Sequence, residues 1–552
     1  MVFLSMPPVA LEIYGGKQVF LIVPRSSRGS RSSSSKKIIA YAMIGILAVA
    51  AVSFTVFARP PAAPANPNNE AGALQSFQEQ WCGPDASANS NAYITEFVLP
   101  SECEMPVGIA VDSEKVWYVS TKRGLLGSYD VAENNFNEYT IPEWPTREQP
   151  FTAVPSWLMS WAVETDASGN VWFTDQINAI WRFNPDSESF DKFPVPAEYP
   201  SSMGFDANGD IYFIGITSKS LFFGDVAAME AGTSNGFTEI LLPLDGFSGI
   251  NPNLVTSGSL VVDNERNDVW VSLLAFQQKG QLFQYDIDAG GIVNIVDLPA
   301  DLSSPVGAAL DDSGNLWVAD HGTSTFFRYD PVQNSITKFV TSIASPRIYG
   351  GTTPANAYTL PYWVEKGPDG SLWFNEHTGN KIARFDPEEL TLAEYWIPSQ
   401  NENGAFCPPG SPTCGIANAM QFAVGQDHVW FSEWTENKIA RLDATKQVPL
   451  AVSSPEEITV ARGDSAEIRV TIDAPGDFAG QMMAASTFTP TGALGDSSGI
   501  FSEESVSISG GSKQASYTFT AAENLAAGQY MILVGAGNDD VSLMKAIRVN
   551  IV

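Results

Sequence analysis

The stretch "LWFNEHTGNKIARFDP", residues 372–387, returns 57 residues later as "VWFSEWTENKIARLD", residues 429–443. The same pattern, an aromatic residue inside a short apolar run, occurs seven times at spacings of 40 to 58 residues. Repeats of this length are typical of propeller blades. The seven marker aromatics are Trp117, Trp172, Tyr212, Trp270, Trp317, Trp373 and Trp430.

Each repeat contains the signals of four antiparallel strands. The marker strand is followed by one such as "KIARFD" and then by an alternating strand usually closed by proline, such as "AEYWIP". Residues 94–100, "ITEFVLP", resemble this last strand but precede any first strand, and the last repeat stops after its third strand. We therefore predict an all-β protein in which residues 91–447 form a seven-bladed β-propeller, closed by residues 94–100.

Residues 448–552 lack Trp, Cys and His and contain alternating runs such as "SAEIRVTIDA". About 100 residues of this kind predict an immunoglobulin-like β-sandwich.

The N-terminal region predicts a membrane anchor. Residues 38–58 are 21 uncharged, mainly apolar residues, long enough to span a bilayer as a helix, and basic residues precede them. By the positive-inside rule, residues 1–37 are cytoplasmic, and the Pro/Asn-rich stalk 59–90 and the body lie outside the cell membrane. A cleaved signal peptide is the alternative.

The net charge of −32 argues against a nucleic-acid partner. Four cysteines fit an extracytoplasmic location, where disulfides persist. Their positions favour the pairs Cys82–Cys103 and Cys407–Cys414, although four cysteines allow three pairings, and a zinc site made of all four is an alternative.

The third residue after each marker aromatic is expected near one rim of the propeller channel. Three consecutive repeats carry a carboxylate there, namely Asp320, Glu376 and Glu433. Clustered carboxylates favour a cation such as Mg²⁺ or Ca²⁺. The alternative is that each carboxylate caps a turn of its own blade.

Long connections are expected to open on the same face, at residues 143–157, 343–363 and 399–419. Long loops on a rigid scaffold commonly form binding sites. The aromatic residues in or beside them that are expected to line such a site are Trp157, Trp161, Tyr349, Tyr362 and Trp363.

Taken together, the repeat resembles that of the virginiamycin B lyase (streptogramin lyase) family of seven-bladed propellers. The resemblance implies elimination chemistry on a cyclic depsipeptide, in which a His removes a proton while two Glu hold Mg²⁺. The family's His lies in an E-P-H-G-I motif, 14 residues before the Glu of W-F-x-E.

This chain departs from that motif in every repeat. The positions of the family's first Glu and of its His are Leu360 and Tyr362 before Glu376; before Glu433 they are Ala417 and Ala419. The three histidines are His321, His377 and His428. His377 is the remaining candidate base, although the residues around it and His321 favour surface positions.

Three functions remain open. The first is a membrane-anchored binding module that has kept the lyase scaffold without lyase activity and takes a small-molecule, peptide or cell-envelope protein ligand. The second is an enzyme, either a Mg²⁺-dependent lyase or a lactone hydrolase. The third is an envelope scaffold whose propeller and sandwich contact other proteins.

Overall fold

The computed structural model describes residues 87–102, 104–112, 115–121, 123–144, 160–175, 177–232, 236–342, 358–400, 416–485, 497–502 and 507–552. The expected membrane anchor and all four cysteines lie outside these ranges, so their assignments stay predictions. Within the ranges, none of the helices has the length and apolar character that crossing a membrane requires.

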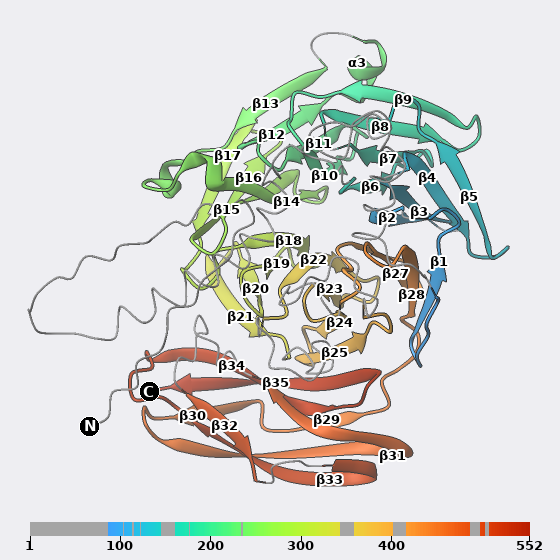
Figure 1. Ribbon diagram of the computed structural model, residues 1–552. Helices are drawn as coiled ribbons and strands as arrows, with labels where there is room; N and C mark the ends of the chain where they lie inside the picture. Colours follow the sequence, from blue (N-terminus) through green and yellow to red (C-terminus); the bar gives the residue numbers. More distant parts are fainter. Residues whose placement is uncertain are drawn as a thin grey trace, which may run out of the picture. The chain divides into compact units, whose positions relative to one another are not determined.

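Seven four-stranded antiparallel units surround a common centre (Figure 1). The first three are β2–β5 (Pro106–Val111, Lys115–Ser120, Leu125–Asp130, Asn135–Thr140), β6–β9 (Val163–Thr165, Val171–Thr174, Ala179–Asn184, Ser189–Pro194) and β10–β13 (Pro200–Phe205, Ile211–Gly215, Ser220–Gly224, Phe237–Leu241). A short helix, α3 (Val226–Glu230), joins β12 to β13, and two 3₁₀ helices, η1 (Asp245–Phe247) and η2 (Pro252–Leu254), follow β13.

The next three units are β14–β17 (Val255–Asp263, Asp268–Ala275, Lys279–Asp286, Gly291–Asp297), β18–β21 (Pro305–Leu310, Leu316–Asp320, Thr325–Asp330, Ser335–Val340) and β22–β25 (Pro361–Lys366, Leu372–Glu376, Lys381–Asp386, Thr391–Trp396). The last contains β26 (Phe422–Val424), β27 (His428–Glu433), β28 (Lys438–Asp443) and β1 (Ile94–Val98). Six units are separate sheets, whereas β22–β25 belongs to an 11-stranded sheet.

In three repeats, an aspartate in the turn before the marker strand binds the marker indole. Asp166 accepts hydrogen bonds from the backbone N–H groups of Ser168 and Asn170, both at 2.9 Å, and from the Trp172 indole at 2.8 Å. Asp311 accepts in the same way from the Trp317 indole at 2.9 Å. The indole N–H is thus bonded to the turn while the ring is buried in the core. One residue therefore both stabilises the turn and fills the core.

The ring closes as the sequence predicts. β1 pairs antiparallel with β28, in a register that places Ile94 opposite Leu442 and Val98 opposite Lys438. The first strand of the described residues therefore completes the last unit. This pairing removes an open edge that would otherwise expose unpaired backbone groups.

The outer strand β25 differs from the other outer strands because it is covered. Residues of β5 are mostly exposed, whereas four of the six residues of β25 are buried. The cover is β35 (Val541–Ile551), which pairs antiparallel with β25 from Thr391↔Lys545 to Tyr395↔Val541. β35 also contributes Met544 and Ala546 to a core shared with Phe374 and Phe385. The C-terminal region is thus joined to the sixth unit by a continuous sheet.

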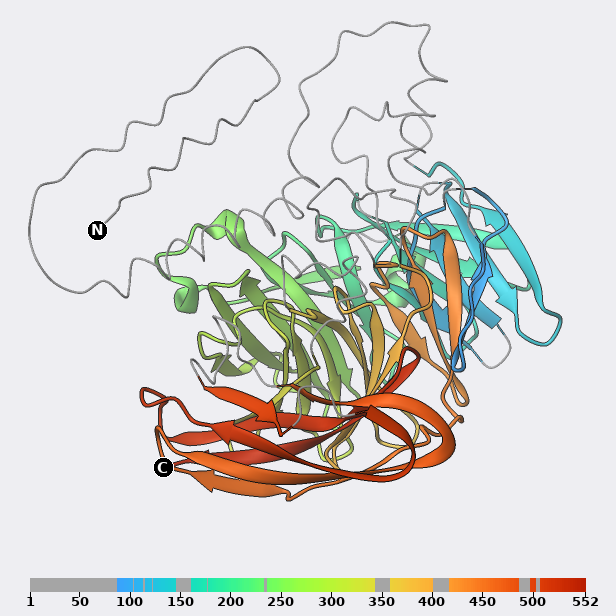
Figure 2. The same ribbon diagram turned by 60° about the horizontal axis from the view of Figure 1, so that its bottom comes forward.

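The described residues between 451 and 551 form only strands and their connections, as expected for an all-β region. Their strands are β29 (Ala451–Ser453), β30 (Glu457–Val460), β31 (Ser465–Ala485), β32 (Ser498–Phe501), β33 (Ser507–Thr520), β34 (Gly528–Gly537) and β35, coloured orange to red in Figures 1 and 2. They enclose a core that includes Ile468, Val470, Phe519 and Ile547. An immunoglobulin-like topology stays a prediction.

Candidate functional site

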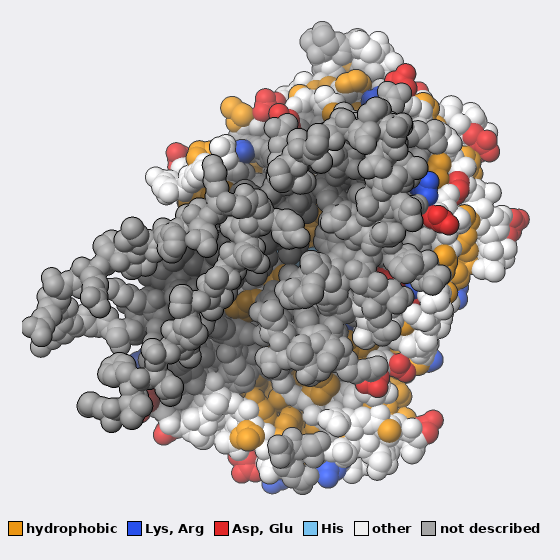
Figure 3. Space-filling model, in the orientation of Figure 1, with side chains coloured by type: hydrophobic (Ala, Val, Ile, Leu, Met, Phe, Trp, Pro, Cys, Tyr) orange, Lys and Arg blue, Asp and Glu red, His pale blue; other side chains and the backbone are white. Residues whose placement is uncertain are grey.

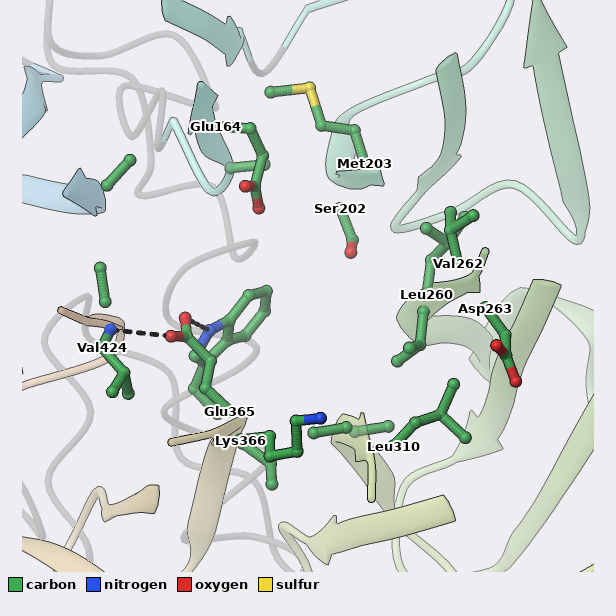
Figure 4. Close-up of a pocket in the computed structure, with 18 of the residues that line it drawn as sticks. Glu164, Ser202, Met203, Leu260, Val262, Asp263, Leu310, Glu365, Lys366 and Val424 are labelled. Carbon is green, nitrogen blue, oxygen red and sulfur yellow. Dashed lines mark hydrogen bonds between the residues drawn. The ribbon is translucent and has the colours of Figure 1, made fainter. Parts of the chain in front are cut away.

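A central cavity is lined by all seven innermost strands, β2, β6, β10, β14, β18, β22 and β26. Its volume is about 540 Å³, which lies within the range of small-molecule pockets. Figure 4 shows apolar side chains such as Leu260, Val262 and Leu310 on its wall, together with the carboxyl groups of Glu164 and Glu365. Around the margin of the view in Figure 3, acidic and basic side chains are interspersed with apolar ones.

Glu164 and Glu365 face one another in this cavity (Figure 4). The Glu365 carboxyl accepts hydrogen bonds from the Trp363 indole at 3.0 Å and from the Val424 backbone N–H at 2.9 Å. Both glutamates are partly buried residues inside the channel. Burial raises the pKa of Glu365 to about 7, against the effect of its two hydrogen bonds, and raises that of Glu164 to about 8, with a further rise caused by Glu365. Near neutral pH the pair therefore retains protons.

The strand register shows that these two glutamates are equivalent. Each pairs with the marker aromatic of its own repeat, Glu164 with Trp172 and Glu365 with Trp373. The other five repeats place Ala, Gly or Val there, namely Ala110, Gly204, Val261, Ala309 and Ala423. Sequence reasoning missed both glutamates, although an alignment of the repeats on their aromatic markers would have revealed this exception.

A second group of residues brings aromatic and imidazole rings together. The rings of Trp161 and Tyr362 lie 6.1 Å apart between centroids. The Tyr362 ring also lies 4.7 Å from that of His321 and 6.2 Å from that of His377, and the two imidazoles are 5.5 Å apart. We call Trp161, Tyr362, His321 and His377 the aromatic cluster. The expectation of surface positions for the two histidines was wrong, because His377 is buried and His321 is partly buried.

The hydrogen bonds of the histidines define their tautomers. Nε2 of His377 lies 3.0 Å from the Asn418 side-chain oxygen, so this nitrogen carries the proton. Backbone carbonyls of Leu360 and Pro361 accept from His321. Nδ1 of each ring has no partner among the described residues. Burial lowers the pKa of both, that of His321 to about 3 with a further contribution from His377, so both imidazoles are neutral at pH 7.

The five aromatic residues predicted to line a site fall into three groups. Trp161 and Tyr362 belong to the aromatic cluster. Trp363 lines the central cavity and donates to Glu365. Trp157 and Tyr349 lie outside the described residues, as do most residues of the three long connections.

The predicted metal ligand Glu376 lies in a buried ionic group of its own repeat. Its carboxylate is 2.9 Å from the Lys381 ammonium, which is 3.0 Å from Glu394. Glu394 also accepts from the backbone N–H and the hydroxyl of Ser342, at 2.9 and 2.5 Å. Burial and the Glu394 charge raise the pKa of Glu376 well above its usual range. Burial would also raise the pKa of Glu394, but Lys381 and the hydrogen bonds from Ser342 outweigh it and lower that pKa to about 2. Glu394 is therefore the ionised partner of Lys381.

Glu433 belongs to the same arrangement in the last repeat. There Lys438 lies 2.8 Å from Glu96, which accepts from the backbone N–H and the hydroxyl of Ser399, both at 2.8 Å. Burial, followed by the Glu96 charge, raises the pKa of Glu433 well above its usual range. Glu96 lies on β1, so the strand that closes the ring also supplies the counter-ion of a buried lysine.

Asp320, the third predicted ligand, caps local structure. It accepts from the Ser304 backbone N–H at 2.6 Å and from the Thr323 hydroxyl at 2.7 Å. Burial raises its pKa to about 7. Within the described ranges, no three His, Cys, Asp or Glu side chains are grouped so that they could hold a metal ion. The assignment of Mg²⁺ or Ca²⁺ to these residues stays a prediction.

No family model and no curated protein matches the chain. Similar solved structures include virginiamycin B lyase from Staphylococcus aureus (20% identity, TM-score 0.46, covering 63% of this chain and 98% of that one). They also include a catalytically inactive variant of that lyase with quinupristin (19%, 0.47, 63% and 98%) and a streptogramin B lyase (21%, 0.47, 64% and 99%). This chain is a β-propeller, and these lyases are among the molecules to which it is similar.

Proposed function

We propose that this chain is a binding module that holds a small molecule or peptide at the aromatic cluster and does not carry out lyase chemistry. The observation that carries the proposal is a set of three buried polar atoms there, Trp161 Nε1, His321 Nδ1 and His377 Nδ1, without partners among the described residues. Leaving a buried donor or acceptor unpaired costs about 1–3 kcal/mol. A ligand with its own donors and acceptors would remove that cost, which supports a binding role.

The groups at the positions of the lyase motif argue against elimination. Elimination requires a base that removes a proton from the substrate. Tyr362 occupies the position at which the resemblance places that base. Burial raises the pKa of the Tyr362 phenol, so it retains its proton at neutral pH. Glu376, at the position of a metal-binding Glu, is protonated beside Lys381. A neutral carboxyl next to an ammonium is a poor ligand for Mg²⁺.

One observation favours the enzyme alternative. Nδ1 of His377 is an unprotonated nitrogen without a partner among the described residues, and the centroid of the His377 ring lies 6.2 Å from that of Tyr362. Such a nitrogen can accept a proton. In that alternative, His377 would be the base of a lyase or of a lactone hydrolase.

Quinupristin with Mg²⁺ tests both candidates. We expect it to change the tryptophan fluorescence of the purified chain and to be recovered in its cyclic form after chromatography. His321→Ala should weaken binding, whereas His428→Ala should not, because His428 lies on β27 outside the cluster. Recovery of a linear product that His377→Ala abolishes would contradict the proposal. An unchanged mass would then identify elimination, and addition of one water would identify hydrolysis.

We also propose that the propeller is held outside the cell membrane by residues 38–58. Their length without a charge and the basic residues before them support this orientation. Protease added to intact cells should then remove the propeller and leave the N-terminal segment with the cells. Full protection of the propeller in intact cells, with digestion after lysis, would contradict the orientation.

A further inference from the structure

The central cavity combines features that point to a ligand of its own. Its volume of about 540 Å³ exceeds what a single ion occupies and fits an organic molecule. Its wall is mainly polar, with apolar patches that include Val163, Met203, Leu260 and Leu310. An organic ligand here would therefore combine polar groups with a small apolar body.

The two glutamates are the groups that can supply negative charge to bind a ligand in this cavity. Of the seven equivalent positions opposite the marker aromatics, only Glu164 and Glu365 carry a carboxyl group, and both line this cavity. Two carboxyl groups that face each other disfavour the doubly ionised state unless a cation joins them. Glu365 is oriented by Trp363 and Val424, while no hydrogen-bond donor to Glu164 is found among the described residues. Glu164 is thus free to bind an incoming cation.

A separate observation concerns a neutral group in the same cavity. Gln421 lines the cavity, is only 3% exposed, and its Nε2 has no partner among the described residues. A buried amide N–H group that lacks an acceptor is uncommon in folded proteins. A ligand oxygen would provide that acceptor.

We propose that the central cavity is a binding site for a small organic cation, with its ammonium group between Glu164 and Glu365 and an oxygen acceptor bonded to Gln421. The apolar patches of the wall contact the body of the ligand. This site is distinct from the aromatic cluster and does not rest on the function proposed for it. The indole of Trp363 beside Glu365 adds an aromatic surface that favours a nearby cation.

The pH dependence of binding follows from the charges. A cation requires ionised carboxyl groups, which must first release their retained protons. The pKa of Glu164 is raised to about 8 and that of Glu365 to about 7, so ionisation increases from pH 6 to pH 8. An aliphatic amine stays protonated over this range, because its pKa is near that of lysine, about 10. Affinity should therefore rise with pH over this range. The other charged groups that line the cavity are Asp263, Glu265, Arg266, Asp311, Asp312 and Lys366.

Calorimetric titration with tyramine tests the proposal in the full chain. Tyramine carries an ammonium group, an aromatic body and a phenol oxygen. Tyrosol, which has a hydroxyl in place of the ammonium, should bind at least about tenfold more weakly, as expected for loss of a charged hydrogen bond. Phenethylamine, which lacks the phenol oxygen, should lose a few-fold in affinity. Gln421→Leu should remove that difference between tyramine and phenethylamine.

The variants separate a built site from general attraction by an acidic protein. Glu164→Gln and Glu365→Gln should each weaken tyramine binding about tenfold or more, and each should reduce its pH dependence, because one titrating carboxyl group remains. Glu133→Gln is the matched control, because Glu133 is an exposed glutamate that does not line the cavity, and it should leave binding unchanged. Equal affinities for tyramine and tyrosol, or equal losses in all three variants, would overturn the proposal. So would calcium ions binding at the two glutamates while tyramine does not bind.

Discussion

Replacing Lys438 with Met should lower the free energy of unfolding by about 3–5 kcal/mol, the usual cost of removing one partner from a buried ion pair. The side chains of Lys438 and Glu96 are 1% and 0% exposed, and their charged atoms lie 2.8 Å apart. Without the ammonium, the buried carboxyl group of Glu96 would keep only the hydrogen bonds from Ser399 and from the Asn89 backbone N–H. Because Glu96 lies on β1, the substitution destabilises the pair of strands, β1 and β28, that closes the ring.

Urea unfolding of the full chain, followed by tryptophan fluorescence, measures this effect. Lys366→Met is the matched control, because Lys366 also forms an ion pair, 2.6 Å from Asp312, but the two side chains are 37% and 80% exposed. That change should cost about 0–1 kcal/mol. If the two variants lose equal stability, burial does not govern the strength of these pairs and the interpretation is wrong.

The fold could be predicted because its signals are local. A marker aromatic such as Trp172 and the aspartate of its turn, Asp166, are six residues apart and bind one another directly. An extra outer strand precedes the first repeat, and the last repeat lacks its outer strand. These two features likewise indicated that β1 closes the ring. The continuous sheet between β25 and β35 could not be predicted in this way, because the paired residues Leu392 and Met544 are far apart in the sequence.

The candidate sites were harder to predict because they depend on register between strands. The copied glutamates, Glu376 and Glu433, looked like neighbours on one rim. Each is instead kept protonated by burial and by a second glutamate of its own unit, and that second glutamate pairs with a buried lysine. These partners come from the third and outer strands, so only the pairing of the strands brings them together. The contact of His321 with Tyr362 similarly joins two adjacent repeats.

Removing residues 448–552 should turn the propeller into an aggregating species with a lower unfolding temperature. In the full chain, β35 pairs with β25 along five residues, and Leu392, Glu394 and Tyr395 of β25 are buried. Truncation would expose this apolar edge with its unpaired backbone groups, which is a common route to aggregation. It would also remove the Ser542 hydroxyl, which donates to Glu394 at 2.9 Å.

Size-exclusion chromatography and thermal unfolding of residues 1–447 beside the full chain, with the same N-terminus, test this expectation. Ser542→Ala is the matched control, because it removes the hydroxyl bond to Glu394 and keeps strand β35 in place. It should cost only about 1 kcal/mol, since Ser342 and Lys381 still hold Glu394, and it should leave the elution volume unchanged. A truncated chain that elutes as the full chain does and unfolds at the same temperature would contradict the prediction. The sixth unit would then be stable with its outer strand exposed, like the other outer strands of the ring.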